Sequence, residues 1–103
     1  MYIYSVIINI EKSAEQEWLD FMQKKHIADV LHTGCFTSAS MRKEINNNDE
    51  SYSVYNIEYM LESEDNYHAY QQKNAPELQK DVADRFNGKF SAVRKFYNVL
   101  FEQ

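Results

Sequence analysis

The sequence predicts an α+β fold with the element order β-α-β-β-α-β. Three observations predict it: strand-like alternation over residues 2–10, two long stretches with helical spacing, and a polar turn at residues 46–51 between two further strand-like stretches. Apolar residues that recur with a period of two indicate strands, whereas spacings of three and four indicate helices. Four strands with a central hairpin and two helices give the ferredoxin-like pattern, an antiparallel sheet with helices on one face.

The composition limits the size and the partners of the protein. A chain of 103 residues is short enough for one domain, which we assign to residues 1–103. The 11 Lys and Arg residues against 16 Asp and Glu give a formal net charge of -5, which repels phosphate backbones and anionic lipids. We therefore expect no nucleic-acid partner.

The sequence contains no segment that is typical of a membrane span or a signal peptide. Its longest apolar run covers residues 1–4, far less than the roughly 20 residues of a membrane span, and its start lacks the basic segment of a signal peptide. The single cysteine agrees with a reducing compartment. We expect a cytoplasmic protein with no membrane partner.

The first strand and the first helix are expected at residues 2–10 and from Ser13 onward. Ser13 and Gln16 have the spacing of a capping box, in which the two side chains bond to each other's backbone N–H groups. Gly34 can take the left-handed conformation that ends a helix. The side of the helix that faces the sheet is expected to hold Ala14, Trp18, Phe21, Met22, His26 and Val30.

The remaining elements follow from similar signals. Strands are expected at residues 36–45 and 52–61, and the last one at residues 90–101. Ser63 is placed to cap the second helix, and Pro76 interrupts and restarts it because proline suits only the first turn. Along the third strand, side chains alternate between Tyr55, Ile57, Tyr59 and Leu61 on one face and Val54, Asn56, Glu58 and Met60 on the other.

The strands carry apolar residues on both of their faces, which predicts a partner for the sheet. One layer of helices covers one face only, and an antiparallel sheet with a free face normally shows water a polar side. The simplest cover is the same sheet of a second copy. We therefore predict a homodimer packed sheet to sheet.

Three motifs together carry a family resemblance. They are Trp18-x-x-Phe21-Met22-x-x-x-His26-Ile27 with Thr33-Gly34-Cys35-Phe36, then Tyr67-x-x-Tyr70-x-x-x-x-Ala75-Pro76-x-Leu78, and Arg85-Phe86-x-Gly88-Lys89-Phe90. Through these motifs, which cover nearly the whole chain, the sequence resembles a small bacterial family of domains of unknown function. That family belongs to the dimeric α+β barrel superfamily. The resemblance implies two ferredoxin-like protomers packed sheet to sheet.

The resemblance implies no activity. The superfamily includes cofactor-free monooxygenases of aromatic substrates, haem-dependent enzymes, muconolactone isomerases and ligand-sensing domains, so a function taken from the fold would be an analogy.

His26 is the candidate catalytic residue. An imidazole that faces a pocket can act as a general base near neutral pH. The alternative is a histidine that only packs near the end of the helix, where its cationic form suits the helix dipole. Since His26 and His32 lie six residues apart, on different sides of a helix, we predict no metal site. We also expect no cofactor. Cys35 follows the negative end of a helix, so we interpret it as a small buried side chain and not as a nucleophile.

A small-molecule pocket is expected between the sheet and the helices, for an aromatic or carboxylated metabolite. The eight tyrosines favour a semi-polar pocket, because their rings pack while their hydroxyls need partners. Arg85 and Arg94 could anchor a carboxylate. Two alternatives to these binding roles stay open: an ion pair of Arg85 with Asp81, and a salt bridge of Glu58 with Arg94 across the dimer interface. The predicted ligand-binding residues are Trp18, Tyr55, Asn56, Glu58, Tyr59 and Arg94.

Three functions are compatible with the sequence. The first is a homodimeric module that binds a small molecule. The second is a cofactor-independent monooxygenase- or isomerase-like enzyme, with His26 as the base and Tyr or Asn donors stabilising an enolate-like charge. The third is a purely structural dimer. A pocket lined by His26 and convergent polar groups favours the first two, whereas a solid core leaves only the third.

Overall fold

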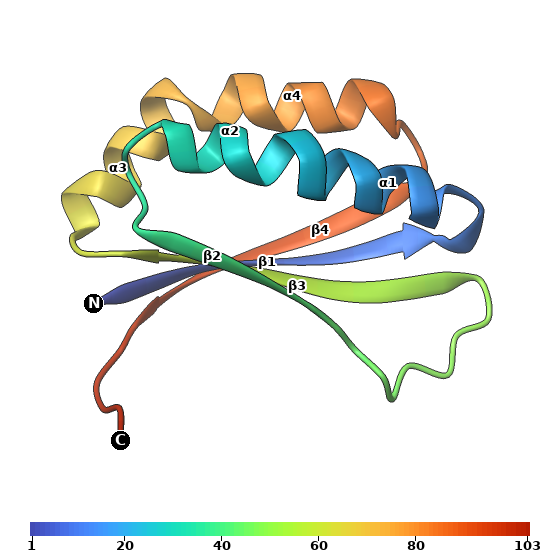
Figure 1. The fold of residues 1–103 in the computed structure, drawn as a ribbon, viewed down its shortest axis with the longest axis horizontal. Coiled ribbons are helices and arrows are strands. Elements are labelled where there is room, and N and C mark those ends of the chain that lie inside the picture. Colours follow the sequence, from blue (N-terminus) through green and yellow to red (C-terminus); the bar gives the residue numbers. More distant parts are fainter.

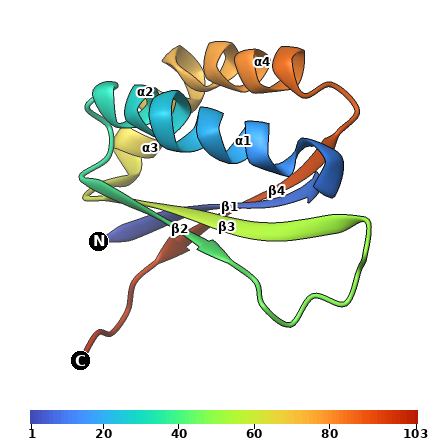
Figure 2. The same ribbon diagram turned by 45° about the vertical axis from the view of Figure 1, so that its right-hand side comes forward.

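The computed structural model describes residues 1–103 and shows one antiparallel sheet with all helices on one face (Figures 1 and 2). The strand order is β2-β3-β1-β4. The strands are β1 (Tyr2–Glu11), β2 (Ser38–Lys43), β3 (Tyr52–Leu61) and β4 (Phe90–Asn98). The helical elements are η1 (Lys12–Ala14), α1 (Glu15–Phe21), η2 (Met22–His26), α2 (Ile27–His32), α3 (Glu64–Lys73) and α4 (Ala75–Arg85). The predicted ferredoxin-like fold is confirmed.

The first helical layer begins differently from the prediction. The chain leaves β1 through the 3₁₀ turn η1, so Ser13 lies inside a helical turn and caps nothing. Gln16 instead donates a hydrogen bond to Asp20 at 3.1 Å. The predicted capping box is therefore wrong, because it requires an extended residue before the helix. From Glu15 the chain stays helical to His32, and the inward residues predicted for this stretch are all buried.

The core lies between the helices and the sheet. Tyr4 of β1 pairs with Tyr59 of β3 and with Phe96 of β4, which places the three aromatic side chains on the helix-covered face. Trp18, Ile10, Val30 and Leu61 have no exposed surface. Full burial of such a side chain contributes about 1.5–3 kcal/mol. None of the helices is long and apolar enough to cross a membrane.

The second half of the chain follows the prediction except at the strand ends. Ser63 accepts a hydrogen bond from the Asn66 N–H at 3.1 Å, and Pro76 stands in the first turn of α4, as expected. The second strand starts only at Ser38, so the buried Phe36 enters the core from a loop and does not share a face with Ser38. β4 ends at Asn98, and the expected strand residues after it form a tail.

The sheet face away from the helices has no cover within the chain. Two segments extend past the sheet on this side, the β2–β3 hairpin loop and the C-terminal tail (Figures 1 and 2). Both carry exposed apolar side chains, Ile45 at 90% in the loop and Leu100 at 88% in the tail. We call the uncovered side the open face. Its apolar residues are Ile3, Ile7, Val54, Met60, Val93 and Tyr97.

Gly34 ends the first helical layer in a left-handed conformation with φ at 80°. We expect Gly34→Ala to lower the free energy of unfolding by about 1–2 kcal/mol, because a Cβ strains this backbone conformation. No atom lies within 4 Å of the added Cβ, so a steric clash does not contribute. Urea unfolding measures the change, and an unchanged midpoint contradicts it. Ala83→Gly, at an exposed position inside α4, is the reference for the opposite exchange, in which a helix loses a Cβ.

Candidate functional site

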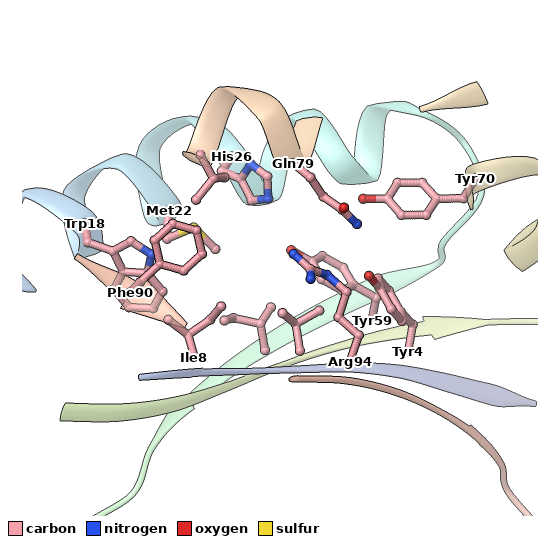
Figure 3. A pocket seen from close by; sticks show the side chains of 13 residues that line it. Tyr4, Ile8, Trp18, Met22, His26, Tyr59, Tyr70, Gln79, Phe90 and Arg94 are labelled. Atoms are coloured by element: carbon pink, nitrogen blue, oxygen red, sulfur yellow. The ribbon is translucent and has the colours of Figure 1, made fainter. Parts of the chain in front are cut away.

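A cavity lies between the helices and the sheet, at the place that the sequence predicts (Figure 3). The enclosed space measures about 40 Å³, and about 460 Å³ when the open mouth is included. Its rim consists of Arg94 and Phe90 from β4 and Gln79 from α4, which are exposed or half-buried. The lining residues are Tyr4, Val6, Ile8, Trp18, Met22, His26, Ile57, Tyr59, Tyr70, Gln79, Val82, Phe90 and Arg94.

A π-helical turn aligns three of these residues. Within η2 the Ile27 N–H donates to the Met22 carbonyl, five residues back. Four residues overshoot one turn of an α-helix by roughly 40°, and the wider π turn reduces this overshoot. Trp18, Met22 and His26, each four residues apart, consequently all reach the cavity. Such insertions occur frequently at functional sites.

Several polar groups at the cavity have no partner. The buried Trp18 Nε1 and His26 Nδ1 make no hydrogen bond. Arg94 takes part in none of the ion pairs of the chain. A buried polar atom without a partner costs about 1–3 kcal/mol, and native proteins leave few of them. This cluster therefore marks the cavity as a candidate binding site.

The environment of His26 favours a neutral imidazole. Burial lowers the pKa of His26 below its ordinary value, and the positive charges of Lys25 and Arg94 act in the same direction. The carboxylates of Asp29 and Asp81 oppose the shift. A neutral imidazole can accept a proton, which a general base requires.

The tyrosines at the cavity are kept protonated. Burial raises the pKa of Tyr59 and Tyr70, and the neighbouring phenols add to the shift. Burial likewise raises the pKa of Tyr4, although Arg94 opposes it. These hydroxyls therefore act as hydrogen-bond donors near neutral pH.

Of the predicted site residues, His26, Trp18, Tyr59 and Arg94 meet at this cavity. Tyr55 lies behind it: its ring packs against the Trp18 ring with the centroids 4.9 Å apart, and its hydroxyl donates to the carboxylate of Glu15. Tyr55 therefore supports the Trp18 ring from behind and does not line the cavity.

Asn56 and Glu58 lie on the open face, on the other side of the sheet from the cavity. Asn56 accepts a hydrogen bond from Ser5 at 2.8 Å, and Glu58 pairs with Arg42 at 2.6 Å. Side chains alternate along a strand, so residues 56 and 58 cannot share a face with Tyr59. Their assignment to one pocket with Tyr59 is wrong. The alternative of a salt bridge between Glu58 and Arg94 across the dimer interface does not fit either, because Arg94 lies opposite Val6 on the helix-covered face.

The sequence reading missed four polar or aromatic residues of the cavity: Tyr4, Tyr70, Gln79 and Phe90. Tyr4 and Phe90 share the helix-side face with Tyr59, so the strand alternation could have found them. Gln79 gives no such signal, because its reach into the cavity depends on how α4 lies over the sheet.

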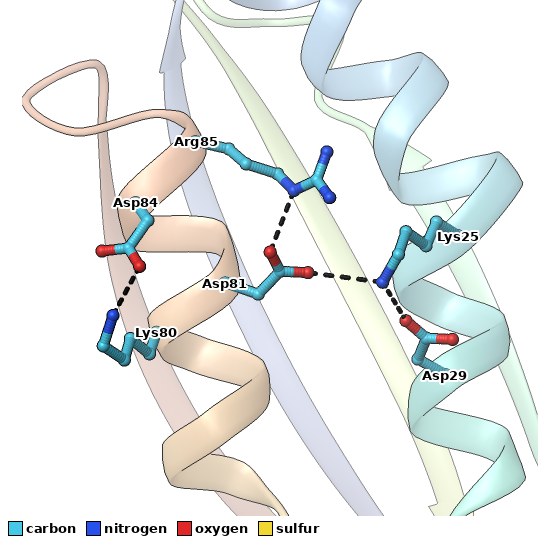
Figure 4. Close-up of polar contacts among 6 residues, drawn as sticks. All are labelled: Lys25, Asp29, Lys80, Asp81, Asp84 and Arg85. Carbon is cyan, nitrogen blue, oxygen red and sulfur yellow. Dashed lines mark hydrogen bonds and ion pairs between the residues drawn. The ribbon is translucent and has the colours of Figure 1, made fainter.

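Ion pairs join the two helices next to His26 (Figure 4). Lys25 of η2 lies 3.4 Å from Asp81 of α4, and Asp81 lies 2.9 Å from Arg85. The alternative interpretation of Arg85, an ion pair with Asp81, is thereby confirmed. Exposed pairs of this kind contribute little stability, about 0–1 kcal/mol each.

The sequence matches the family model of a domain of unknown function, DUF4286, over residues 1–100. The chain belongs to this family. No curated protein matches it in sequence. The predicted membership of a family of unknown function is confirmed.

Several solved structures have the same fold as this DUF4286 chain. A dimeric ferredoxin-like protein from an uncultured marine organism superposes with a TM-score of 0.76 at 12% identity, covering 99% of this chain and 98% of its own. A protein from Arabidopsis thaliana gives 0.73 at 12% identity, covering 100% and 99%. SnoaB, a cofactor-independent oxygenase from Streptomyces nogalater, gives 0.68 at 14% identity, covering 98% and 95%. At such identities the likeness shows the fold alone.

The lowered pKa of His26 predicts a pH dependence of stability for this DUF4286 chain. Below the ordinary histidine pKa of about 6.5, the unfolded chain binds a proton at His26 that the folded chain does not. Stability therefore falls as the pH decreases through this range.

Between about pH 7.5 and about pH 5.5, we expect His26→Gln to lose less unfolding free energy than wild type. Urea unfolding at each pH measures the loss. His68→Gln, at an exposed histidine, should keep the wild-type dependence. Equal losses in all three proteins contradict the prediction.

Proposed function

We propose that this protein is a homodimer in which each protomer binds a small aromatic or carboxylated molecule in the cavity between the helices and the sheet. The observation that carries the proposal is that two buried atoms without a partner, Trp18 Nε1 and His26 Nδ1, face one cavity, together with Arg94, which forms no ion pair. A purely structural core gains nothing from leaving these two buried atoms without partners. A cytoplasmic location stays a prediction.

The homodimer is supported by the open face. Apolar side chains from three strands lie there without cover, and the hairpin loop and the tail extend past the sheet on the same side (Figure 1). The dimeric ferredoxin-like protein from an uncultured marine organism has the same fold. An exposed patch of this kind is typical of an interface between copies. A monomer mass by light scattering at micromolar concentration would contradict the dimer.

The cavity and the open face lie on opposite sides of the sheet. Dimerisation therefore leaves the cavity mouth between α4 and β4 accessible. The two parts of the proposal are independent and can be tested separately.

The binding proposal is tested by a thermal-shift screen with aromatic and carboxylated small molecules. We expect hits to raise the melting temperature of wild type and of His68→Ala, and to have a smaller effect on His26→Ala, because only His26 faces the cavity. Compounds that stabilise His26→Ala as much as wild type show that His26 is not part of the site. A screen without any hit leaves the structural dimer.

A second candidate function, an isomerase- or oxygenase-like enzyme, is favoured by the neutral imidazole beside several donors. His26 would take the proton next to the carbonyl of a bound ligand, and Arg94, Trp18 or Tyr59 would stabilise the enolate-like charge. Asn56 cannot serve as this donor, since it lies on the open face.

This function is tested by incubating hits of the screen with the protein in D₂O. Proton NMR should show exchange of the proton next to the carbonyl, lost in His26→Ala and kept in His68→Ala. Exchange at the uncatalysed rate in wild type rejects proton abstraction and leaves the binding function.

A further inference from the structure

The cavity offers hydrogen-bond donors in excess of acceptors. The Trp18 indole and the Arg94 guanidinium only donate. The Trp18 Nε1 makes no hydrogen bond, and Arg94 forms no ion pair. The hydroxyls of Tyr59 and Tyr70 are kept protonated by burial and are free to donate. The lining contains no Asp and no Glu. A ligand that satisfies this site must supply acceptor atoms.

The charge of the site points the same way. Arg94 carries the only full charge of the lining, because His26 is held neutral. The acids nearest to His26, Asp29 and Asp81, are already paired with Lys25 and Arg85 at the surface. A guanidinium without a carboxylate partner is the group that proteins use to hold planar anions, often through two parallel hydrogen bonds.

The volume limits the size of the ligand. An engineered cavity of about 150 Å³ binds benzene, whereas one water molecule needs about 10–15 Å³. The enclosed 40 Å³ therefore admits a group of a few heavy atoms and no aromatic ring. Any larger part of the ligand must lie in the mouth between α4 and β4.

The two ends of the cavity differ in character (Figure 3). Trp18, Met22, Phe90 and Ile8 gather at one end, whereas Arg94 stands beside Tyr4, Tyr59 and Tyr70 at the other, with Gln79 extending toward it. A ligand with one charged and one apolar end matches this arrangement. Its anionic group would lie at Arg94 and its short apolar part against Trp18.

We propose that the cavity binds a short-chain aliphatic carboxylate, with the carboxylate on the Arg94 guanidinium and the alkyl chain against Trp18, Met22 and Phe90. This inference rests on the proposed binding function and selects the ligand class within it. The small enclosed volume leaves room there for part of a short alkyl chain, whereas an aromatic ring would have to lie in the mouth.

The test compares sodium butyrate with butyramide, its neutral counterpart of nearly the same shape, in ¹H–¹⁵N NMR titrations up to roughly 10 mM, the range in which ligands this small bind. The indole N–H resonance of Trp18, the single tryptophan, reports on the cavity directly. We expect butyrate to shift this resonance with saturation, and butyramide to bind about tenfold or more weakly, since it loses a charge-assisted pair.

Two variants complete the test. Arg94→Gln should weaken butyrate binding about tenfold or more and leave the weaker binding of butyramide unchanged. Lys95→Gln removes the same charge from the next residue, whose side chain lies on the open face, and should bind butyrate like wild type. Circular dichroism of both variants establishes that they are folded.

The outcomes separate this inference from the proposed function. Equal affinities for butyrate and butyramide, or a butyrate affinity unchanged in Arg94→Gln, overturn the carboxylate assignment while cavity binding stands. No shift with either compound, together with hits in the thermal-shift screen, also overturns the ligand class alone. No shift and no hit overturn both. A butyrate affinity that Lys95→Gln reduces as much as Arg94→Gln indicates nonspecific charge attraction and overturns the proposal.

Discussion

Replacement of Trp18 by alanine is expected to lower the free energy of unfolding by about 3–5 kcal/mol, the usual cost of deleting a fully buried aromatic side chain. Trp18 has no exposed surface and packs against the ring of Tyr55. Its loss would join the space of the indole to the existing cavity, which enlarges the void that the surrounding side chains cannot fill. Since a domain of this size has about 5–15 kcal/mol of stability in total, Trp18→Ala should unfold at a clearly lower urea concentration than wild type.

The matched variant is Trp18→Phe, which keeps an aromatic ring but removes the indole N–H. That N–H has no partner, so its removal relieves a desolvation cost, while the smaller ring leaves a smaller void. We expect the two effects to offset each other to within about 1.5 kcal/mol. Urea unfolding followed by circular dichroism measures both variants. A loss in Trp18→Phe as large as in Trp18→Ala would show that the N–H has a partner in solution.

Most of the fold could be predicted from the sequence because its signals are local. The alternation in residues 2–10, the cap at Ser63 and the restart at Pro76 each depend on neighbouring residues only, and the structure confirms them. The capping box at Ser13 fails because the path of the chain out of β1 decides it, and that path is a tertiary feature.

The candidate site could be predicted only in part. The helix period identifies Trp18 and His26 as inward residues, but it cannot show the π-helical turn that aligns them. For Asn56 and Glu58 the sequence contains the correct information, since the alternation already separates them from Tyr59. The error came from treating both faces of β3 as one pocket. Gln79 and the cavity volume depend on the packing of α4 on the sheet, which no local pattern encodes.

The open face provides the second large expected effect, a change in dimer affinity. Ile7 lies in the middle of the central strand β1, between Asn56 of β3 and Val93 of β4. It is half-buried within one chain, and its side chain points away from the helices. In the proposed dimer it is covered by the second sheet. Ile7→Lys then places an unpaired ammonium in the interface, at a cost of several kcal/mol.

We therefore expect Ile7→Lys to raise the dissociation constant of the dimer by about 100-fold or more, which corresponds to about 2.7 kcal/mol. Analytical ultracentrifugation over a concentration series measures it. The isolated protomer should stay folded, because within one chain the lysine can reach water along the uncovered sheet. Gln23→Lys adds the same charge at an exposed position of the helix layer and should leave the dimer intact. If Ile7→Lys dimerises as tightly as Gln23→Lys, the open face is not the interface, and the hairpin loop and the tail must extend toward something other than a second copy.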